Sequence, residues 1–286
     1  MARNRDRLGG GRPPDADSPP PNVMQDNQTE GFSFVVPTDF VELPSQGKYY
    51  PENHPLHGQE SIEIKQMTAK EEDILTSRTL LRKGIALDRV LQSVILNKNV
   101  DTDTMLVGDR NAIIVAMRVA GYGSEYVTKV TCPACQTTQE HAFHLHEMDV
   151  YRGEDAADYN VQDNGNGTFD VELPRTKVNV TFKLLTGQDE KRLLRAMENS
   201  RKRKSPEKTI TTQLKSMIVG VNGDTSQQAV NYLIDNMPSM DSRHLRLVYR
   251  LTTPNVDLTQ AFECAECGHE EDMEVPLTAE FFWPNQ

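Results

Sequence analysis

The four cysteines of the chain form two pairs with the same spacing. Cys132 and Cys135 make one Cys-x-x-Cys pair, and Cys264 and Cys267 make the other. Each pair lies between two runs of alternating apolar and polar residues, which predicts a tight turn between two strands. Such a turn places both sulfur atoms on one side and supplies half of a tetrahedral site. We therefore predict one structural Zn²⁺ bound by all four cysteines, with no open coordination position for a substrate.

The same four ligands are compatible with other chemistry. Four cysteine thiolates also bind iron in rubredoxin-like sites, so iron is the alternative metal. A thioredoxin-like redox pair opens a helix after a strand, and neither pair has that context. Disulfides within each pair are disfavoured in a reducing cytoplasm. The histidines near the pairs are expected to be exposed strand residues and not ligands: His141, His144, His146 and His269.

The cysteine pairs are the last of several short stretches that occur twice in the same order. Residues 41–44 read Val-Glu-Leu-Pro, and so do residues 171–174. Length differences fall between the matching stretches, in positions expected to be loops. Because five matches in one order are improbable by chance, we infer an internal duplication covering about residues 34–145 and 169–277. The other matches are 62–72 with 180–190, 91–96 with 214–219, and Asp109 with Asp241, each 23 residues before a cysteine pair (132 − 109 = 264 − 241 = 23).

The matching stretches predict the same elements in both copies. Alternating apolar residues predict a strand before Thr68 and another before Thr186. Each threonine precedes an acidic residue by three positions, Glu71 and Asp189, which is the capping-box arrangement at a helix start. The remaining predicted elements are half-buried helices over 91–96 and 214–219 and further helices that begin at Asp109 and Asp241.

These elements predict an α+β protein built from an internally duplicated unit. Each unit has a short β-hairpin, about three helices and a zinc-knuckle hairpin, and the two knuckles form one four-cysteine zinc-ribbon-like site with a pseudo-twofold relation. Residues before about Phe32 are rich in Gly and Pro and poor in large apolar side chains, which predicts disorder. The expected organisation is a disordered arm (1–31), repeat 1 ending in the first knuckle (32–146), an acidic connector (147–168), and repeat 2 ending in the second knuckle and an aromatic C-terminus (169–286).

Composition and charge exclude several functional classes. The 286 residues include 31 Lys and Arg against 42 Asp and Glu, for a net charge of −11. No stretch approaches the roughly 18 apolar residues of a membrane span, and the N-terminus lacks the apolar segment of a signal peptide. We therefore expect a cytoplasmic protein with no membrane contact. The acidic balance makes nucleic acid an unlikely partner, and the basic run at 201–204 is expected to be solvated at a helix end.

No group of residues supports an enzymatic mechanism. The sequence has no P-loop, HExxH motif or nucleophile elbow. Residues 121–123, Gly-Tyr-Gly, lack the rest of a dinucleotide fingerprint and predict a helix stop. Residues 163–167 lack the ligands of a calcium loop, and their Asn-Gly pairs predict a hairpin turn. We therefore expect no catalytic residues and no small-molecule substrate.

Three aromatic residues lie at the C-terminal end of the sequence. Phe281, Phe282 and Trp283 are consecutive and precede Pro284, and Trp283 is the single tryptophan. The first interpretation is that they cap the core beside the second knuckle. The alternative is that Phe281 to Pro284 form an anchor for a partner protein, since Trp and Phe bury large apolar areas.

Several segments together resemble a family of bacteriophage proteins. The chain is similar to the baseplate hub subunits and baseplate hub assembly proteins of T-even-type contractile-tailed bacteriophages. The resemblance extends over nearly all residues from Phe34 to Pro284. The segments that carry it are 41–50 (VELPSQGKYY), 67–75 (MTAKEEDIL), 108–111 (GDRN), 121–126 (GYGSEY) and 281–284 (FFWP).

The resemblance implies a non-enzymatic role in forming the central hub of the tail baseplate. It implies other hub or tail proteins as partners, the cytoplasm of the infected bacterium as the place of assembly, and the virion tail baseplate as a further location. Family members include both virion components and assembly factors. The alternative class is a zinc-ribbon adaptor that binds nucleic acid in phage transcription, and both the net charge and the scarcity of basic residues near the knuckles disfavour it.

Overall fold

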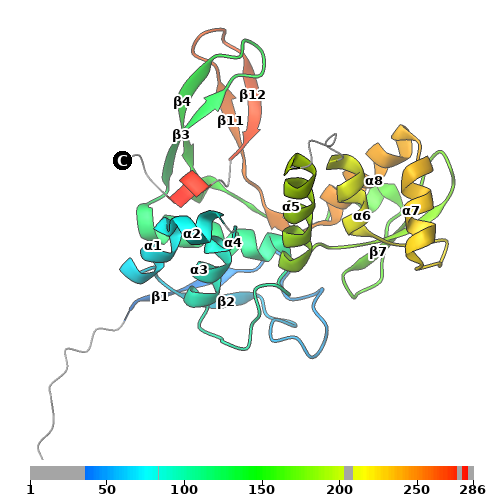
Figure 1. The fold of residues 1–286 in the computed structure, drawn as a ribbon, viewed down its shortest axis with the longest axis horizontal. Helices are drawn as coiled ribbons and strands as arrows, with labels where there is room; N and C mark the ends of the chain where they lie inside the picture. The colour runs from blue at the N-terminus through cyan, green and yellow to red at the C-terminus, as the bar shows by residue number, and fades with distance from the viewer. Residues whose placement is uncertain (1–35, 83, 203–208, 276–278, 283–286) are drawn as a thin grey trace, which may run out of the picture. The chain divides into compact units, whose positions relative to one another are not determined.

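The computed structural model describes residues 36–82, 84–202, 209–275 and 279–282, which fall within one unit, Val36–Gln286 (Figure 1). Helices and strands are interspersed along these residues, which confirms the predicted mixture of α and β structure. The predicted arm and the second half of the basic run lie outside the described residues. None of the described helices has both the length and the apolar content required to cross a membrane.

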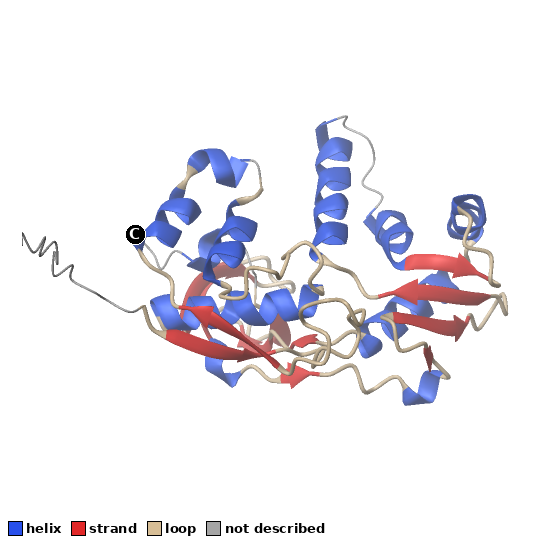
Figure 2. Cartoon of the chain, turned by 90° about the horizontal axis from the view of Figure 1, so that it is seen from below, coloured by secondary structure: helices blue, strands red, loops and turns tan. Residues whose placement is uncertain are grey.

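The N-terminal elements comprise two hairpins with four helices between them. In the first hairpin, β1 and β2 are antiparallel, and Val41 pairs with Ile62. Figures 1 and 2 show α1 to α3 over one face of this hairpin. Four helices replace the expected three or so, because the extended backbone of Ser77 ends α1 and a short α2 follows. The elements are β1 (Thr38–Glu42), β2 (Ser61–Lys65), α1 (Ala69–Thr76), α2 (Arg78–Arg82), α3 (Ala86–Val94), α4 (Val107–Tyr122), β3 (Glu125–Thr131) and β4 (Thr138–His144).

The C-terminal elements again place helices between two hairpins, but with the additional strands β9 and β10, and they come after a connector with short strands of its own. A four-stranded sheet has the order β6-β7-β8-β9, and the predicted turn at 164–167 joins β6 to β7. The connector strand β5 pairs with β10, about a hundred residues later. The elements are β5 (Val150–Tyr151), β6 (Gln162–Asp163), β7 (Thr168–Glu172), β8 (Asn179–Lys183), α5 (Gly187–Lys202), α6 (Thr209–Met217), β9 (Ile218–Val221), α7 (Gln227–Asn236), α8 (Ser239–Thr252), β10 (Asn255–Val256), β11 (Thr259–Glu263) and β12 (Glu270–Glu274).

Both predicted capping boxes are present at the starts of α1 and α5. The backbone N–H of Thr68 donates to the Glu71 carboxylate at 3.0 Å, and that of Thr186 donates to the Asp189 carboxylate at 3.1 Å. Each acidic residue thereby accepts a hydrogen bond from a backbone N–H at a helix start. Its negative charge also interacts favourably with the positive end of the helix dipole. The same carboxylates bind the last lysines of the preceding strands, Lys65 at 2.8 Å and Lys183 at 2.7 Å.

A buried aspartate near the start of a helix anchors the loop after each Val-Glu-Leu-Pro stretch. Asp109 accepts hydrogen bonds from the backbone N–H and the hydroxyl of Ser45, at 3.0 and 2.6 Å, and from the Tyr50 hydroxyl at 2.7 Å. Asp241 accepts the backbone N–H of Arg175 at 2.7 Å. Ser45 and Arg175 are the residues that directly follow the two Val-Glu-Leu-Pro stretches. The helices predicted to begin at Asp109 and Asp241 begin two residues earlier, at Val107 and Ser239, and the structure gives the two aspartates a long-range role.

The helices predicted over 91–96 and 214–219 end earlier than expected. α3 and α6 stop one residue before Ile95 and Ile218, and both isoleucines pair with strands. Ile95 forms an antiparallel bridge with Ile64, and Ile218 pairs with Phe182. A β-branched residue fits a strand at least as well as a helix, and the neighbouring strand supplies the backbone partners. Helical periodicity does not reveal that a neighbouring strand competes with the helix for these isoleucines.

The N-terminal and C-terminal elements meet through backbone pairing and a cluster of charges. The N–H of Val107 donates to the carbonyl of Leu185 at 3.0 Å, and that of Gly187 donates to Met105 at 2.9 Å. Glycine is required at position 187, because a Cβ atom there would lie 2.7 Å from the backbone carbonyl oxygen of Thr102 as well as 2.0 Å from Nη1 of Arg110. The charge cluster contains the ion pairs Arg110–Asp88 at 2.7 Å, Arg110–Glu190 at 3.2 Å and Lys191–Asp88 at 2.9 Å, together with Lys191–Asp103.

The substitution Glu71→Gln is expected to destabilise the chain in a pH-dependent way. Burial alone would raise the pKa of Glu71, but hydrogen bonds from Lys65, Ser93 and Thr68 outweigh it and lower that pKa to about 2. A depressed carboxyl pKa gives stability that is present above the unfolded value of 4.5 and lost as the pH falls towards 2. We expect a loss of about 2 kcal/mol at pH 7 that shrinks below pH 4.

Urea unfolding of the wild type and Glu71→Gln at pH 7 and pH 3 measures this difference. The exposed residue Glu60 gives a control, because Glu60→Gln removes a charge from a side chain outside the buried network. A loss of the same size at both pH values would show that the Glu71 carboxylate does not act through its charge.

Candidate metal centre

Two β-hairpins bring the cysteine pairs together. β3 pairs with β4 and β11 with β12, and the turns Thr131–Thr138 and Glu263–Glu270 carry the cysteines. Figure 1 shows the two hairpins side by side, with both turns at the same end. The predicted placement of each Cys-x-x-Cys in a strand-to-strand turn is confirmed.

The two turns have the same backbone hydrogen bonds. In the first, the N–H of Cys132 donates to Thr137 at 2.9 Å, and the N–H of Gln136 donates back to Cys132 at 2.9 Å. In the second, Cys264 bonds to His269 and Gly268 bonds to Cys264, both at 2.9 Å. The residue after the second cysteine has a left-handed φ in both turns, 63° at Gln136 and 65° at Gly268. Glycine adopts that conformation without cost, whereas Gln136 adopts it because the turn requires it.

The four sulfur atoms form one cluster. All of them lie within 4.8 Å of one another. The Sγ atoms of Cys132 and Cys267 are 3.8 Å apart, and those of Cys135 and Cys264 are 3.7 Å apart. A tetrahedral Zn²⁺ with Zn–S bonds of about 2.3 Å holds its sulfur atoms about 3.8 Å apart. The shortest separations therefore fit this ion, and each joins one hairpin to the other.

The thiols of the cluster differ in their tendency to ionise. Hydrogen bonds from the hydroxyl and N–H of Thr137 lower the pKa of Cys135 to about 6. The N–H of His269 also favours the thiolate of Cys267, but the nearby sulfur of Cys135 and the other cysteines raise its pKa to about 12. One thiolate thus forms readily, and adjacent sulfurs oppose a second because like charges repel. A divalent cation removes this repulsion, which fits the donor set to a metal.

Two glutamine side chains hold the hairpins against each other. The Gln139 side chain donates to the carbonyl of Glu263 and accepts from the N–H of Ala265, both at 2.9 Å. The Gln260 side chain accepts the N–H of His144 at 2.9 Å and donates to its carbonyl at 2.8 Å. Sequence analysis did not identify either glutamine, because an isolated amide in a strand carries no signal of its partner.

The nearby histidines lie outside the sulfur cluster. His141 packs edge-on against Phe143 and Phe262, with ring centroids 4.6 and 5.3 Å away. His144 and His146 are exposed, and His269 contacts Glu271 at 3.3 Å. The candidate metal ligands among the described residues at this site are the cysteines alone.

The C-terminal phenylalanines are buried below the knuckle hairpins. Phe281 is 0% exposed and Phe282 is 4% exposed. The Phe281 ring packs edge-on against Tyr126 of β3, with centroids 5.1 Å apart. These phenylalanines therefore pack in the core, as the first interpretation expects. Trp283 and Pro284 lie outside the described residues.

A buried arginine connects these phenylalanines to the first hairpin. Arg118 of α4 is 1% exposed and donates to three backbone carbonyls, those of Phe281 at 2.7 Å, Gly123 at 2.7 Å and Glu125 at 2.9 Å. The carbonyls compensate the cost of burying the guanidinium group. Gly123, with φ of 82°, ends α4 as the Gly-Tyr-Gly motif predicted. Sequence analysis missed Arg118, since helix periodicity alone places charged residues on the surface.

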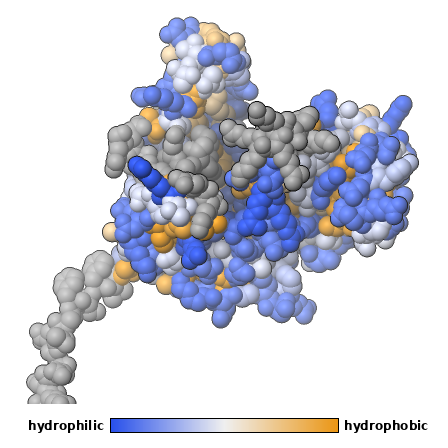
Figure 3. All heavy atoms as spheres, in the orientation of Figure 1, coloured by the Kyte–Doolittle hydropathy of each residue, from blue (hydrophilic) through white to orange (hydrophobic). Residues whose placement is uncertain are grey.

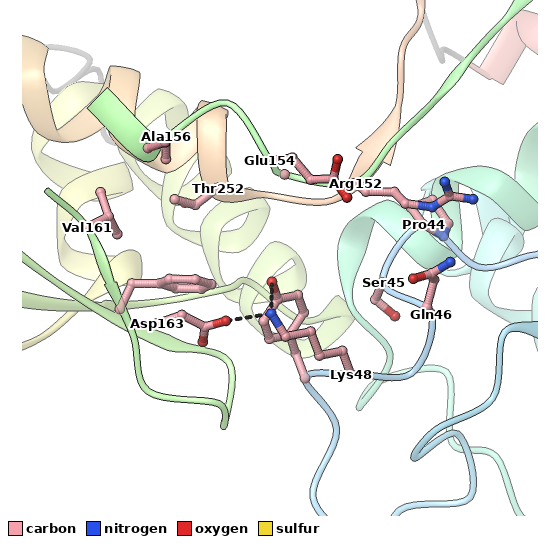
Figure 4. Close-up of a pocket in the computed structure, with 14 residues that line it drawn as sticks. Pro44, Ser45, Gln46, Lys48, Arg152, Glu154, Ala156, Val161, Asp163 and Thr252 are labelled. Atoms are coloured by element: carbon pink, nitrogen blue, oxygen red, sulfur yellow. Dashed lines mark hydrogen bonds and ion pairs between the residues drawn. The ribbon is translucent and has the colours of Figure 1, made fainter. Parts of the chain in front are cut away.

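A pocket separate from the cysteine cluster lies beside the Val-Glu-Leu-Pro-Ser-Gln-Gly-Lys loop. This pocket of about 350 Å³ lies between that loop and the connector (Figure 4). Its Lys48 forms an ion pair with Asp163 at 2.7 Å, as the figure shows, and its Arg152 pairs with Glu42. Because both cations already have acidic partners, the pocket is best explained as a junction between the N-terminal elements and the connector.

The fold and the four-cysteine cluster define a protein of mixed helices and strands in which the hairpins β3–β4 and β11–β12 meet at a potential metal site. Residues 37–168 match the family model of the T4 bacteriophage base plate protein. This match confirms the resemblance seen in the sequence motifs and supports a T4-type phage baseplate protein. The matched residues run from the start of β1 to the first residue of β7 and include the first cysteine pair. No curated protein and no solved structure matched the chain.

Proposed function

We propose that the chain is a non-enzymatic protein of the baseplate hub, acting as a hub subunit or as a factor that assembles the hub. The observation that carries this proposal is the joining of two matching hairpins by four cysteines. A four-thiolate site has no open position for a substrate, so its role is to fix the relative position of two halves. The family match supplies the setting, and the partners are other baseplate hub or tail proteins.

The two halves are proposed to be copies of one duplicated unit, repeat 1 (32–146) and repeat 2 (169–286), joined by the connector (147–168). Three long-range or capping contacts support the duplication, because each occurs at positions that align in the sequence. They are the pairing of Ile64 with Ile95 and of Phe182 with Ile218, the binding of Ser45 by Asp109 and of Arg175 by Asp241, and the binding of Lys65 by Glu71 and of Lys183 by Asp189. Chance similarity of short motifs would not reproduce their tertiary partners.

The proposed metal is structural Zn²⁺ bound by Cys132, Cys135, Cys264 and Cys267. Elemental analysis of the full chain, purified without added metal, is expected to give one zinc per chain. Iron in its place, with the visible absorption of an iron–thiolate site, would assign the alternative metal. A chain that folds fully and contains neither metal would contradict the proposed site.

Quantitative mass spectrometry of purified phage particles and of infected lysate tests the location of the protein. A fixed small copy number per particle is the result expected for a hub subunit in the virion tail. Abundance in the lysate and absence from particles is expected for an assembly factor in the host cytoplasm. Release of particles with complete hubs in normal number by a phage lacking the gene would contradict both roles, since either one makes hub formation depend on this chain.

The alternative role of a zinc-ribbon adaptor for nucleic acid has little support at the proposed metal centre. Strand β12 carries four exposed or half-exposed acidic side chains beside the second knuckle, and phosphate groups are repelled by such a surface. Trp283 and Pro284 remain the predicted partner anchor at the C-terminus, and we propose them as contacts to another hub protein.

A further inference from the structure

Among the residues that the structure describes, strand β1 has a strand partner on one edge only. That edge pairs with β2, and backbone bonds from Leu43 to Glu60 at 2.8 Å and from Gln66 to Pro37 at 2.9 Å set the register. In an antiparallel pair, alternate residues direct their N–H and C=O groups to the partner strand. The odd-numbered residues of β1 face β2 in this way. The backbone groups of Thr38, Phe40 and Glu42 therefore point away from β2, along what we call the β1 edge.

The corresponding edge in the C-terminal elements is covered by a strand. With the offset of 130 between the Val-Glu-Leu-Pro stretches (171 − 41 = 130), Phe40 corresponds to Asp170. Asp170 pairs with Gln162 of β6, and the N–H of Asn164 donates to Thr168 at 3.0 Å. Among the described residues, nothing takes the place of β6 beside Phe40. In the C-terminal elements, the edge that corresponds to the β1 edge is thus covered by a short antiparallel strand, β6.

The β1 edge borders an apolar groove. The groove has a volume of about 490 Å³ and lies between β1 and one face of α4, which contributes Ala112, Val115, Ala116 and Val119. Leu145, Met148 and Val150, which follow β4 in the chain, also line it. Phe40 lines the groove and is 73% exposed, one of the two most exposed large apolar side chains described. Figure 3 shows apolar residues at the surface near the start of β1. An exposed edge beside an apolar surface is a site that proteins normally cover.

The sequence before β1 differs from the turn that brings β6 onto β7. The β6–β7 turn consists of residues 164–167, Asn-Gly-Asn-Gly, and it includes two glycines with left-handed φ angles. The corresponding residues 34–37 are Phe-Val-Val-Pro, which contain no Gly, Asn or Asp. β-branched residues oppose the tight reversal that β6 makes. The sequence at 34–37 therefore lacks the residue types that form the turn between β6 and β7.

We propose that the β1 edge binds an extended segment of another baseplate protein by strand addition. This inference rests on the proposed function, because it identifies the surface through which the chain contacts the hub. The segment forms backbone hydrogen bonds with Phe40 and places apolar side chains at alternate positions into the groove against α4. A second copy of this chain is a poorer occupant, because the net charge of −11 opposes self-association.

The test uses photocrosslinking in phage-infected cells. Benzoylphenylalanine is incorporated at position 40 of the full chain, and the crosslinked peptides are identified by mass spectrometry. The control carries the same group at position 232, because Tyr232 on α7 is also 73% exposed. We expect position 40 to crosslink to one peptide of another baseplate protein, and we expect position 232 to give no crosslink to that peptide. Crosslinks only to residues 1–35 of the same chain, only to a second copy, or equally from both positions would overturn the inference.

Two substitutions then separate backbone pairing from side-chain contact, with the crosslinker placed at position 38. Phe40→Pro removes an N–H that does not bond to β2, so the β1–β2 hairpin is retained. We expect it to reduce the crosslink at least tenfold, and Phe40→Ala to reduce it only about threefold. If Phe40→Pro lowers the melting temperature, the Phe40→Ala result and the crosslink from position 40 still test whether the β1 edge binds another baseplate protein. Equal crosslinking by all three chains would overturn the inference, while the particle mass spectrometry would still test the hub role separately.

Discussion

The substitution Cys264→Ser is expected to abolish metal binding and to lower the free energy of unfolding by at least about 3 kcal/mol. Cys264 is 1% exposed, and its sulfur lies 3.7 Å from that of Cys135 on the other hairpin. A bound metal therefore crosslinks segments 264 − 135 = 129 residues apart in the sequence. Because the unfolded chain holds no preformed site, the energy of metal binding becomes energy of folding.

Thermal unfolding and elemental analysis of the full chain measure both effects. The matched control is Ala265→Ser, which adds a hydroxyl at an exposed neighbouring position and leaves all four sulfurs in place. A strong chelator is expected to lower the melting temperature of the wild type and the control, and to leave Cys264→Ser unchanged. If Cys264→Ser retains both its zinc and its melting temperature, the proposed site is wrong. If it is destabilised although the chelator has no effect on the wild type, Cys264 acts through packing alone.

The substitution Asp109→Ala is expected to destabilise the chain by about 3 to 5 kcal/mol, with no change in metal content. Asp109 is 1% exposed and is the shared acceptor for Ser45 and Tyr50. Its removal leaves a backbone N–H and two hydroxyls without this buried acceptor, and the Val-Glu-Leu-Pro loop loses its anchor to α4. Burial raises the pKa of Asp109, while the hydrogen bonds from Ser45 and Tyr50 act in the opposite direction.

Denaturant unfolding of Asp109→Ala, Asp109→Asn and Asp73→Ala tests this role. Asp109→Asn retains one acceptor oxygen and buries no charge, so its loss should be smaller than that of Asp109→Ala. Asp73 is an exposed acidic residue of α1, and Asp73→Ala is expected to change stability by less than about 0.5 kcal/mol. Equal stability of Asp109→Ala and the wild type would show that the Ser45 and Tyr50 donors find other partners at no cost.

Local features of the sequence determined the starts and stops of several elements. The capping residues Thr68 and Thr186 begin helices because their acidic partners lie three positions later in the same chain segment. Gly123 ends α4 because it adopts a φ that other residues disfavour. The Cys-x-x-Cys turns are also local, since five or six residues define the backbone conformation. Interactions of this range can be read directly from residue type and spacing.

Other features depended on contacts that no local pattern encodes. Helical periodicity extended α3 and α6 by two residues, to 96 and 219, because Ile95 and Ile218 pair with strand residues more than thirty positions away. The pairing of β5 with β10 and the hydrogen bond from Arg118 to the Phe281 carbonyl were likewise absent from the sequence-based description. In each case the decisive partner is distant in sequence, and its position is known only when the chain is folded.

The sequence by itself identified the ligands of the candidate metal site and the recurring stretches on either side of it. It did so because cysteine chemistry and capping depend on residue identity at short spacing. Only the tertiary structure decided that Gln139 and Gln260 join the two hairpins, and that β1 has no second strand partner among the described residues. Those outcomes depend on how separate elements pack, because their free energy comes from surfaces and backbone groups that meet only in the folded chain.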